Sequence, residues 1–386
     1  MSKWKMVRLG DVCEIIMGQS PSSETYNDTG EGLPFYQGKT DFGERYPIVR
    51  MYCKLPQKTA QKNNILMSVR APVGPVNIAT EKCCIGRGLS ALFPHYNILD
   101  YNYLFYFCRS KEKEIEKLGT GSTFKAICRK DLESLTLPLP PLDEQKRIAD
   151  VLDKASELIK KRIEQIRLMD ELAKSLFIEM FGDPVENPMG WDVYLIKDLA
   201  NPEKNSIKAG PFGSSLKKEF YVTQGYKIYG QEQVISGDVD FGDYYISEDK
   251  YLELKSYSIK ENDVLISLVG TYGKLLIIPH IFRSGIINPR LMKISFDLKR
   301  IIPIYFKFFF ESDSVKKSLK EKSHGGTMDI LNVGIIKMIN IPLPPLSLQQ
   351  EFADRIAVIE QQKALLQDGL AKMETAYKAL MQEYFG

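Results

Sequence analysis

LPLPPLDEQKRIADVLDKA (137–155) and IPLPPLSLQQEFADRIAVI (341–359) are two versions of one segment, and they begin 204 residues apart. The same offset relates SLFIEMFG, which ends at Gly182, to ALMQEYFG, which ends at Gly386. No gap is needed between these points. The chain therefore repeats a proline-rich start and a long segment after it without any change in length.

The repeat extends upstream, but there its offset varies. The glycine loops GTGSTFKAI (119–127) and SHGGTMDIL (323–331) still lie 204 residues apart, whereas NNILMSVRAPVGPV (63–76) and NDVLISLVGTYGKL (262–275) lie 199 apart. Near the start, WKMVRLGDV (4–12) and WDVYLIKDL (191–199) lie 187 apart. A unit this long is not a solenoid repeat, so we interpret the chain as a duplicated module of one variable domain and one element of fixed length.

The fixed part is predicted to be a long helix in each copy. Proline disfavours helix in the residue before it, so 138–141 should be an extended exit from a strand. Asp143 is a candidate N-cap, and Ser347 with Gln350 forms a candidate capping box. About 39 residues at roughly 1.5 Å each make a helix about 58 Å long.

Apolar residues recur in heptads along both segments, which predicts an antiparallel coiled coil between them. Arg162 and Lys363 interrupt the stripe, and Gly369 should cost about 1 kcal/mol relative to alanine. A homodimeric coiled coil is the alternative, but tethering on one chain favours pairing within it. The predicted seam residues are Ile148, Leu152, Ile159, Ile166, Met169, Leu176, Phe352, Ile356, Ile359, Leu366, Leu370, Met373 and Leu380.

The predicted fold class is α+β: a tandem repeat of a strand-rich α+β domain and a long helix. The expected boundaries are 1–141 for the first domain, 142–182 for the first helix, 183–345 for the second domain and 346–386 for the second helix. Within the domains, we expect a strand that ends in a Pro/Gly loop at 65–74, strands at 132–140 and 335–344, a hairpin at 264–278, and helices at 103–118 and 305–319.

Bulk composition excludes several classes of protein. The 386 residues are 44% hydrophobic and 26% charged, with a net charge of +3, as in a globular chain of two domains. No apolar run is long enough for a membrane span and the N-terminus lacks a secretion signal, so we expect a cytoplasmic protein. The six cysteines lack metal-binding spacing, and we expect reduced, mostly buried thiols and no metal.

Catalytic signatures are missing from both copies. The chain contains no G-x-x-x-x-G-K-[ST], G-x-S-x-G or H-E-x-x-H motif, no [DNS]-P-P-[YFW] methylation loop and no glycine-rich cofactor loop after a strand. A duplicated enzyme should show its signature twice. A non-catalytic binding protein, with no cofactor in this chain, is therefore the better interpretation.

The predicted loops suit DNA. MGQSPSSETYN (17–27) and AGPFGSSLKK (209–218) carry glycine and short polar side chains that can approach phosphates. Arginine can bond guanine edges in a bidentate manner, and Gln or Asn can bond adenine. From residue type and position, the candidate DNA-binding residues are Gln19, Ser20, Gln37, Lys39, Arg70, Arg87, Thr120, Ser122, Lys125, Lys208, Ser214, Ser215, Lys217, Lys218, Gln231, Tyr272, Asn288, Arg290 and Thr327.

These motifs, in this order and duplicated, resemble the specificity subunit of a type I restriction-modification enzyme. The resemblance rests on MGQSPSSETYN at 17, GLPFYQG at 32, VRAPVGPVNIA at 69, CIGRGLSAL at 84, LPLPPLDEQKRIADVLD at 137, GPFGSSLK at 210 and IPLPPLSLQQ at 341. It implies two target-recognition domains, each of which reads half of a bipartite DNA site. It also implies a helix pair that sets the spacer and docks two methyltransferase subunits.

The resemblance also implies where the cofactors lie. S-adenosylmethionine, ATP and Mg are expected in the methyltransferase and restriction/translocase partners. The second copy reads Leu-Gln-Gln-Glu at 348–351 where the first reads Glu-Gln-Lys-Arg at 144–147, a difference that would weaken a symmetric partner contact. The alternatives are an autonomous DNA-modifying enzyme and a coiled-coil scaffold without a nucleic-acid role.

Overall fold

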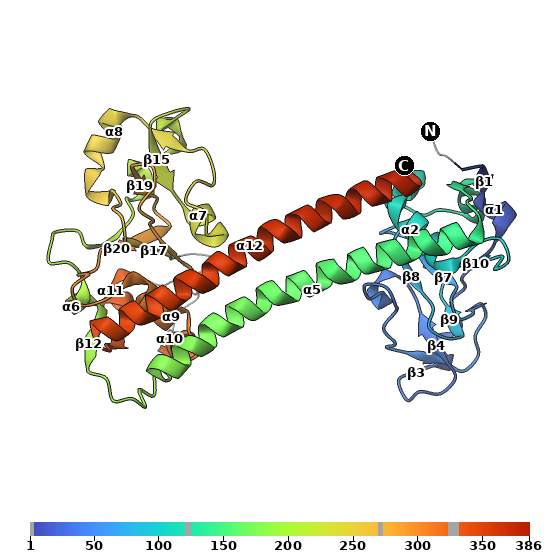
Figure 1. The fold of residues 1–386 in the computed structure, drawn as a ribbon, viewed down its shortest axis with the longest axis horizontal. Coiled ribbons are helices and arrows are strands. Elements are labelled where there is room, and N and C mark those ends of the chain that lie inside the picture. Colours follow the sequence, from blue (N-terminus) through green and yellow to red (C-terminus); the bar gives the residue numbers. More distant parts are fainter. Residues whose placement is uncertain (1–3, 120–124, 269–272, 323–331) are drawn as a thin grey trace. The chain divides into compact units, whose positions relative to one another are not determined.

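The computed structural model describes residues 4–119, 125–268, 273–322 and 332–386. It divides into two compact units, one made of residues 1–164 and 366–386 and the other of residues 165–365. Each long helix contributes one part to each unit. Figure 1 labels the elements of both units.

Unit 1 is built on an antiparallel four-stranded sheet in the order β2 (Cys13–Met17), β10 (Leu89–Pro94), β7 (Ile65–Ser68) and β8 (Val76–Ile78). A smaller mixed sheet has the order β3 (Tyr26–Asn27), β5 (Tyr52–Cys53), β4 (Leu33–Tyr36), β9 (Cys83–Ile85) and β6 (Thr59–Ala60). Strand β1 (Met6–Arg8) pairs with β11 (Thr136–Pro138). The helices are α1 (Leu9–Val12), α2 (Tyr101–Ser110), α3 (Glu112–Leu118) and α4 (Arg129–Ser134), with 3-10 turns η1 (Ser23–Thr25) and η2 (Lys39–Asp41).

Unit 2 repeats this plan. Its antiparallel sheet has the order β13 (Ile207–Ala209), β20 (Leu291–Ile294), β17 (Val264–Ser267) and β18 (Leu275–Ile277), and its small sheet has the order β14 (Tyr221–Val222), β16 (Tyr245–Ile246), β15 (Tyr226–Tyr229) and β19 (Gly285–Ile287). Strand β12 (Val193–Leu195) pairs with β21 (Asn340–Pro342). The helices are α6 (Ile196–Leu199), α7 (Gln231–Ser236), α8 (Glu248–Glu253), α9 (Pro303–Glu311), α10 (Asp313–Lys322) and α11 (Val333–Lys337), with 3-10 turns η3 (Gly213–Ser215), η4 (Lys218–Phe220) and η5 (Lys255–Tyr257).

One of the two inner strands of each large sheet, β7 or β17, is buried on both faces, which explains its unbroken apolar sequence. In β7, Ile65 and Met67 join the core that also contains α2 and the long helices, while Leu66 faces a second core against the small sheet. In unit 2, Val264 and Ile266 of β17 likewise belong to the core that contains the long helices, whereas Leu265 belongs to a second core against the small sheet. Figure 1 shows this order in each unit, with the large sheet beside the long helices and the small sheet beyond it.

Two predicted strands are wrong in their first halves. The segments 132–140 and 335–344 were expected to be extended throughout, but each begins in a short helix, α4 or α11. The cause is local capping, because Asp131 accepts a hydrogen bond from the Cys128 amide at 2.7 Å and Asn332 accepts one from Ile335 at 2.9 Å. Within these two segments, only the later residues are strands, β11 and β21. The predicted helices 103–118 and 305–319 are each present as two shorter helices.

The long helices are α5 (Leu142–Phe181) and α12 (Leu346–Phe385). Asp143 and Ser347 were candidate N-caps, but both lie inside the first turn. The carbonyl of Pro141 instead accepts the first hydrogen bonds, from Glu144 at 2.9 Å and Gln145 at 3.0 Å. The last proline of each Leu-Pro-Pro segment is therefore the residue directly before the helix, and its carbonyl accepts the first helical hydrogen bonds.

A buried glutamine ties each helix start to its domain. In unit 1, Gln145 accepts a hydrogen bond from the Asp100 amide and donates to the carbonyls of Ile98 and Pro140, each at 2.8 Å. In unit 2, Gln349 makes the same three bonds with Ile302, Arg300 and Pro344 at 2.9, 3.1 and 2.9 Å. Both side chains are fully buried, so these bonds replace water for every polar group involved.

None of the predicted seam residues is exposed. At the domain ends they enter the cores: Ile148 and Leu152 in unit 1, and Phe352 and Ile356 in unit 2. Within unit 1 the last turn of α12 packs beside the first turns of α5, because Phe385 belongs to the same core as Leu152. The helix segments are therefore antiparallel inside each unit.

The two charged seam residues each find a partner on the neighbouring helix segment. Arg162 donates to the Leu366 carbonyl at 3.4 Å, and Lys363 forms an ion pair with Asp170. A Cβ atom at Gly369 would lie 2.2 Å from the Arg162 guanidinium. The glycine that seemed a weakness in the helix therefore leaves room for the arginine.

Candidate nucleic-acid interface

The sheet polarity of unit 1 brings five separate loops to one edge. Strand β10 is antiparallel to β2 and β7, and β9 is parallel to β4. The segments that follow β2, β4 and β7 therefore meet the turn between β9 and β10. This loop edge carries Gln19, Ser20, Gln37, Lys39, Arg70 and Arg87, and Lys125 joins it because the Ala71 amide bonds the Lys125 carbonyl at 3.1 Å.

Backbone contacts hold these loops together. The Gly18 amide bonds Leu89 at 2.8 Å, and the Arg87 amide bonds the Ser20 hydroxyl at 3.2 Å. A Cβ atom at Gly18 would lie 2.2 Å from the Gly86 carbonyl, and one at Gly88 would lie 2.3 Å from the Gln37 carbonyl. Only glycine allows the strands' ends to approach this closely.

Four cationic side chains of this edge are free to meet a ligand. Lys39, Arg70, Arg87 and Lys125 are exposed, whereas the neighbouring Asp41 is buried with its carboxylate bonded to the Gln37 and Gly38 amides. The edge is thus locally basic although the chain carries a net charge of only +3. Such a surface attracts a polyanion, and its arginines can bond base edges.

Unit 2 repeats the same edge. The Gly210 amide bonds Leu291 at 2.8 Å, as Gly18 bonds Leu89, and the Leu268 amide bonds Arg290 at 2.9 Å, as Val69 bonds Gly88. A Cβ atom at Gly210 would lie 1.9 Å from the Asn288 carbonyl. The chain therefore has two copies of one loop edge.

Some predicted residues of unit 2 have internal partners. Gln231 donates to Ser267 at 2.7 Å, and Asn288 accepts from the Arg290 amide at 2.9 Å. Lys208 donates to Ser256 at 2.7 Å and lies over the Tyr257 ring, and burial lowers its pKa. Arg290 and the segment around η3 and η4, with Ser214, Ser215, Lys217 and Lys218, present side chains that are exposed or half-buried.

Phe212 was missed from the sequence and is the most exposed large apolar residue of the described chain, at 86%. It follows Gly210, directly after β13, at the loop edge of unit 2. The signal was present in GPFGSS, where Phe212 lies between Pro211 and Gly213, outside any apolar run of the sequence. An exposed aromatic ring beside a basic loop can stack on a base or enter a base step.

Four predicted residues, Thr120, Ser122, Tyr272 and Thr327, lie outside the described residues.

Among the described residues, no three His, Cys, Asp or Glu side chains gather so as to hold a metal ion. Five of the six cysteines are buried and Cys128 is exposed, all without a disulfide. Burial raises the pKa of Cys83 and of Cys84 to about 12, which leaves both thiols protonated and unreactive. In the described part of the chain no helix is both long and apolar enough to cross a membrane.

Comparison with known proteins relates the chain to one family. The family model described as type I restriction modification DNA specificity domain matches residues 1–168 and 188–375. A putative type I restriction enzyme MjaX specificity subunit from Methanocaldococcus jannaschii is 49% identical over 168 residues, which are 42% of this chain and 40% of that protein. The MjaVIII specificity subunit of the same organism is 23% identical over 98% of this chain and 91% of its own length. The crystal structure of a type I restriction-modification S subunit from M. genitalium covers 100% of this chain and 96% of its own, with a TM-score of 0.60 and 17% identity, and so shares the fold.

Proposed function

The chain belongs to the type I restriction-modification DNA specificity family, and from this premise we propose that it is the non-catalytic specificity subunit of a type I restriction-modification complex. Each recognition domain reads one half of a bipartite DNA site through its loop edge. The observation that carries this proposal is the duplication of that edge, with equivalent backbone bonds at Gly18 and Gly210.

The side chains we assign to DNA contact are those that the fold leaves exposed. In unit 1 they are Gln19, Gln37, Lys39, Arg70, Arg87 and Lys125, and in unit 2 they are Phe212, Ser214, Lys217, Lys218 and Arg290. Arg87 lies in the middle of the edge, between Gly86 and Gly88, and is our first choice for a bidentate contact with guanine. Ser20, Gln231 and Asn288 are assigned to supporting the loops, because each already bonds a neighbour there.

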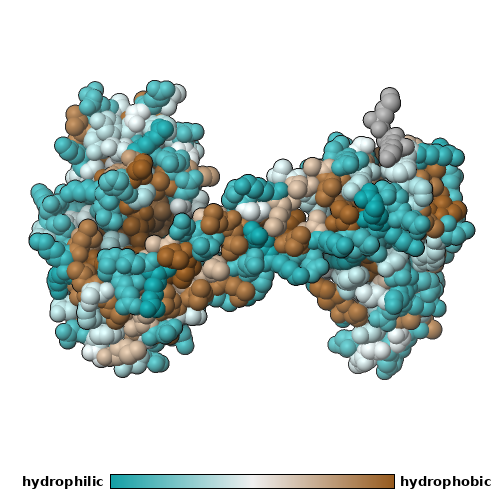
Figure 2. Space-filling view, in the orientation of Figure 1, coloured by the Kyte–Doolittle hydropathy of each residue, from teal (hydrophilic) through white to brown (hydrophobic). Residues whose placement is uncertain are grey.

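The outer faces of the long helices support docking of two methyltransferase subunits. Large apolar side chains on these faces are 45 to 61% exposed although the helices are otherwise rich in Lys, Glu and Gln: Leu158, Ile163, Leu168, Leu172, Ile178, Val358 and Leu365. Figure 2 shows apolar surface along these helices. Exposed apolar groups of this kind mark protein contacts. The methyltransferase partners would supply S-adenosylmethionine, and restriction/translocase partners would supply the ATP- and Mg-dependent steps, all in the cytoplasm.

Sequencing of methylated DNA tests this function. Cells that express the chain with its methyltransferase partner should modify one bipartite sequence, and Arg87→Ala should relax or abolish recognition of one half-site only. Loss of a bidentate contact costs about 1 to 3 kcal/mol of binding free energy. Lys62→Ala is the matched control, because Lys62 is an exposed cation that precedes β7, whereas Arg70 and the loop edge lie at the other end of that strand. Methyl transfer by the purified chain alone, or equal effects of the two variants, would contradict the proposal.

A further inference from the structure

A loop of the first recognition domain lies between η2 and β5 and is firmly held by its own domain. The Ile78 amide of β8 bonds the Arg45 carbonyl at 2.9 Å, and the Asn77 side chain bonds the Gly43 carbonyl at 3.1 Å. Within the loop, the Gly43 amide bonds Tyr46 at 3.1 Å. The loop therefore moves with the large sheet and not independently of it.

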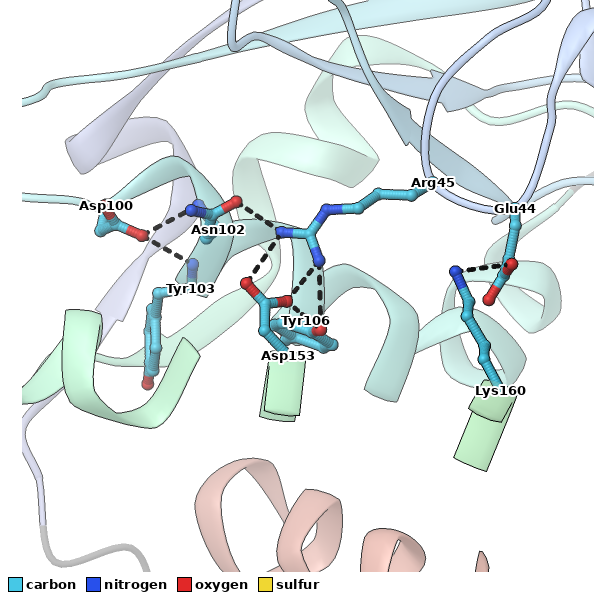
Figure 3. Close-up of polar contacts among 8 residues, drawn as sticks. All are labelled: Glu44, Arg45, Asp100, Asn102, Tyr103, Tyr106, Asp153 and Lys160. Carbon is cyan, nitrogen blue, oxygen red and sulfur yellow. Dashed lines mark hydrogen bonds and ion pairs between the residues drawn. The ribbon is translucent and has the colours of Figure 1, made fainter. Parts of the chain in front are cut away.

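The Arg45 side chain of this loop reaches the long helix α5. Its guanidinium bonds both carboxylate oxygens of Asp153, donates to the Asn102 side chain at 2.7 Å and to the Tyr106 hydroxyl at 3.3 Å, and lies 5.1 Å above the Phe105 ring. Tyr106 donates to the same carboxylate. Figure 3 shows the guanidinium between Asp153 and α2.

The environment of this arginine strengthens the contact. The Arg45 and Asp153 side chains are 21% and 34% exposed, so water screens the pair only in part. Burial alone lowers the pKa of Arg45, but the hydrogen bond and charge of Asp153 outweigh it and raise that pKa above its usual value. A planar, bidentate pair with further hydrogen bonds fixes orientation as well as distance.

Unit 2 lacks the side chains that hold Arg45 in unit 1. Tyr103 of α2 and Tyr305 of α9 are equivalent, since their hydroxyls bond Pro138 and Pro342 at 2.8 and 2.5 Å. The equivalents of Asn102, Phe105 and Tyr106 are thus Ile304, Lys307 and Phe308, and Ala357 replaces Asp153.

Where Arg45 and its loop fill unit 1, unit 2 has an open cleft. Its volume is about 570 Å³, and Lys307 and Phe308 of α9, Ile235 of α7 and Phe177 of α5 line it. The corresponding hollow beside Glu44 and Arg109 in unit 1 measures about 310 Å³. The two domains are therefore attached to the helices in different ways.

We propose that Arg45 is a positioning residue that clamps the first recognition domain onto α5, and that the second domain is held on the helices without such a clamp, by its apolar core and by Gln349. This inference rests on the proposed function. The clamp then fixes where the first half-site is read, and its loss should let the complex accept DNA with altered spacing between the half-sites.

The test measures the binding of the complete complex, with its methyltransferase subunits, to duplexes carrying the methylated motif with its natural spacer or with one base pair added or removed. Arg45→Ala and Asp153→Ala should each reduce the preference for the natural spacer by roughly three- to tenfold, and the double variant should do no more than either alone. Arg45→Lys should resemble Arg45→Ala, because a lysine cannot bond both carboxylate oxygens.

Lys160→Ala is the matched control. It removes the neighbouring Lys160–Glu44 ion pair, which joins the same loop to the same helix at 2.8 Å but is 50% and 60% exposed. This variant should keep the wild-type spacer preference. An unchanged preference in Arg45→Ala and Arg45→Lys, or an equal loss of affinity for all duplexes, would overturn the clamp. A wild-type complex that binds no sequence selectively would instead overturn the proposed function, so the two failures are distinguishable.

Discussion

At the scale of single residues, Phe212 is the side chain whose exposure is hardest to explain without a ligand. At 86% exposure it contributes little to the fold, in contrast to the buried Pro211 before it. A solvent-exposed ring in a basic loop gains most of its binding energy only when a base or ribose covers it.

Phe212→Ala should therefore weaken DNA binding without changing stability. We expect a loss of about 1 to 3 kcal/mol in binding free energy, as for removal of a stacking ring, and an unchanged melting temperature. Ile281→Ala is the control, because Ile281 is 85% exposed in the same unit but precedes β19, away from the loop edge. Titration of labelled target duplex into the complex measures both variants. An effect of similar size in both would show that Phe212 has no special role.

At the scale of secondary structure elements, the start of each long helix depends on one glutamine. The sequence indicates that this glutamine matters, because it is the one residue shared by the equivalent segments 144–147 and 348–351, as Gln145 and Gln349. Periodicity predicted the helices and their seam, but it could not show that a side chain in the first turn reaches back to the loop before α2 or α9. That contact depends on tertiary packing, as do the capping bonds that turned the expected strands at 132–140 and 335–344 partly into helix.

Gln145→Leu should destabilise unit 1 and leave unit 2 unchanged, and Gln349→Leu should do the reverse. Each change strands one amide and two carbonyls in a buried site, and a single unsatisfied buried group costs about 1 to 3 kcal/mol. Hydrogen exchange can follow α2 and α9 separately, and protection should fall only in the helix next to the altered glutamine. Lys146→Ala, at an exposed neighbouring position, should leave both unchanged. A drop in both helices, or in neither, would contradict a local anchor.

At the scale of the whole molecule, the duplication is the property that the sequence revealed most completely. The constant offset of 204 residues covers the long helices, and the variable offsets cover the recognition domains. Sheet order, strand polarity and the two loop edges could not be derived from the offsets, because they depend on pairings between distant strands such as β4 with β9. The residue types at the edges were predicted in part, since the loops were recognised by composition. The Arg45 clamp was not, because Arg45 and its partners lie on three separate segments, the loop before β5, α2 and α5.

We expect the two long helices to act as a ruler that sets the length of the spacer between the half-sites. Removing seven residues from each, 161–167 and 365–371, deletes segments that face each other, because Arg162 lies against Leu366 and Gly369. Seven residues are close to two helical turns and about 10 Å, so the seam keeps its register while each helix shortens. At about 3.4 Å per base pair, the spacer of the methylated site should shorten by about three base pairs. Both half-site sequences should stay the same, because neither loop edge is altered. Sequencing of methylated DNA reads spacer and half-sites together, and a shortened pair that still modifies the original spacer would show that the helices do not measure it.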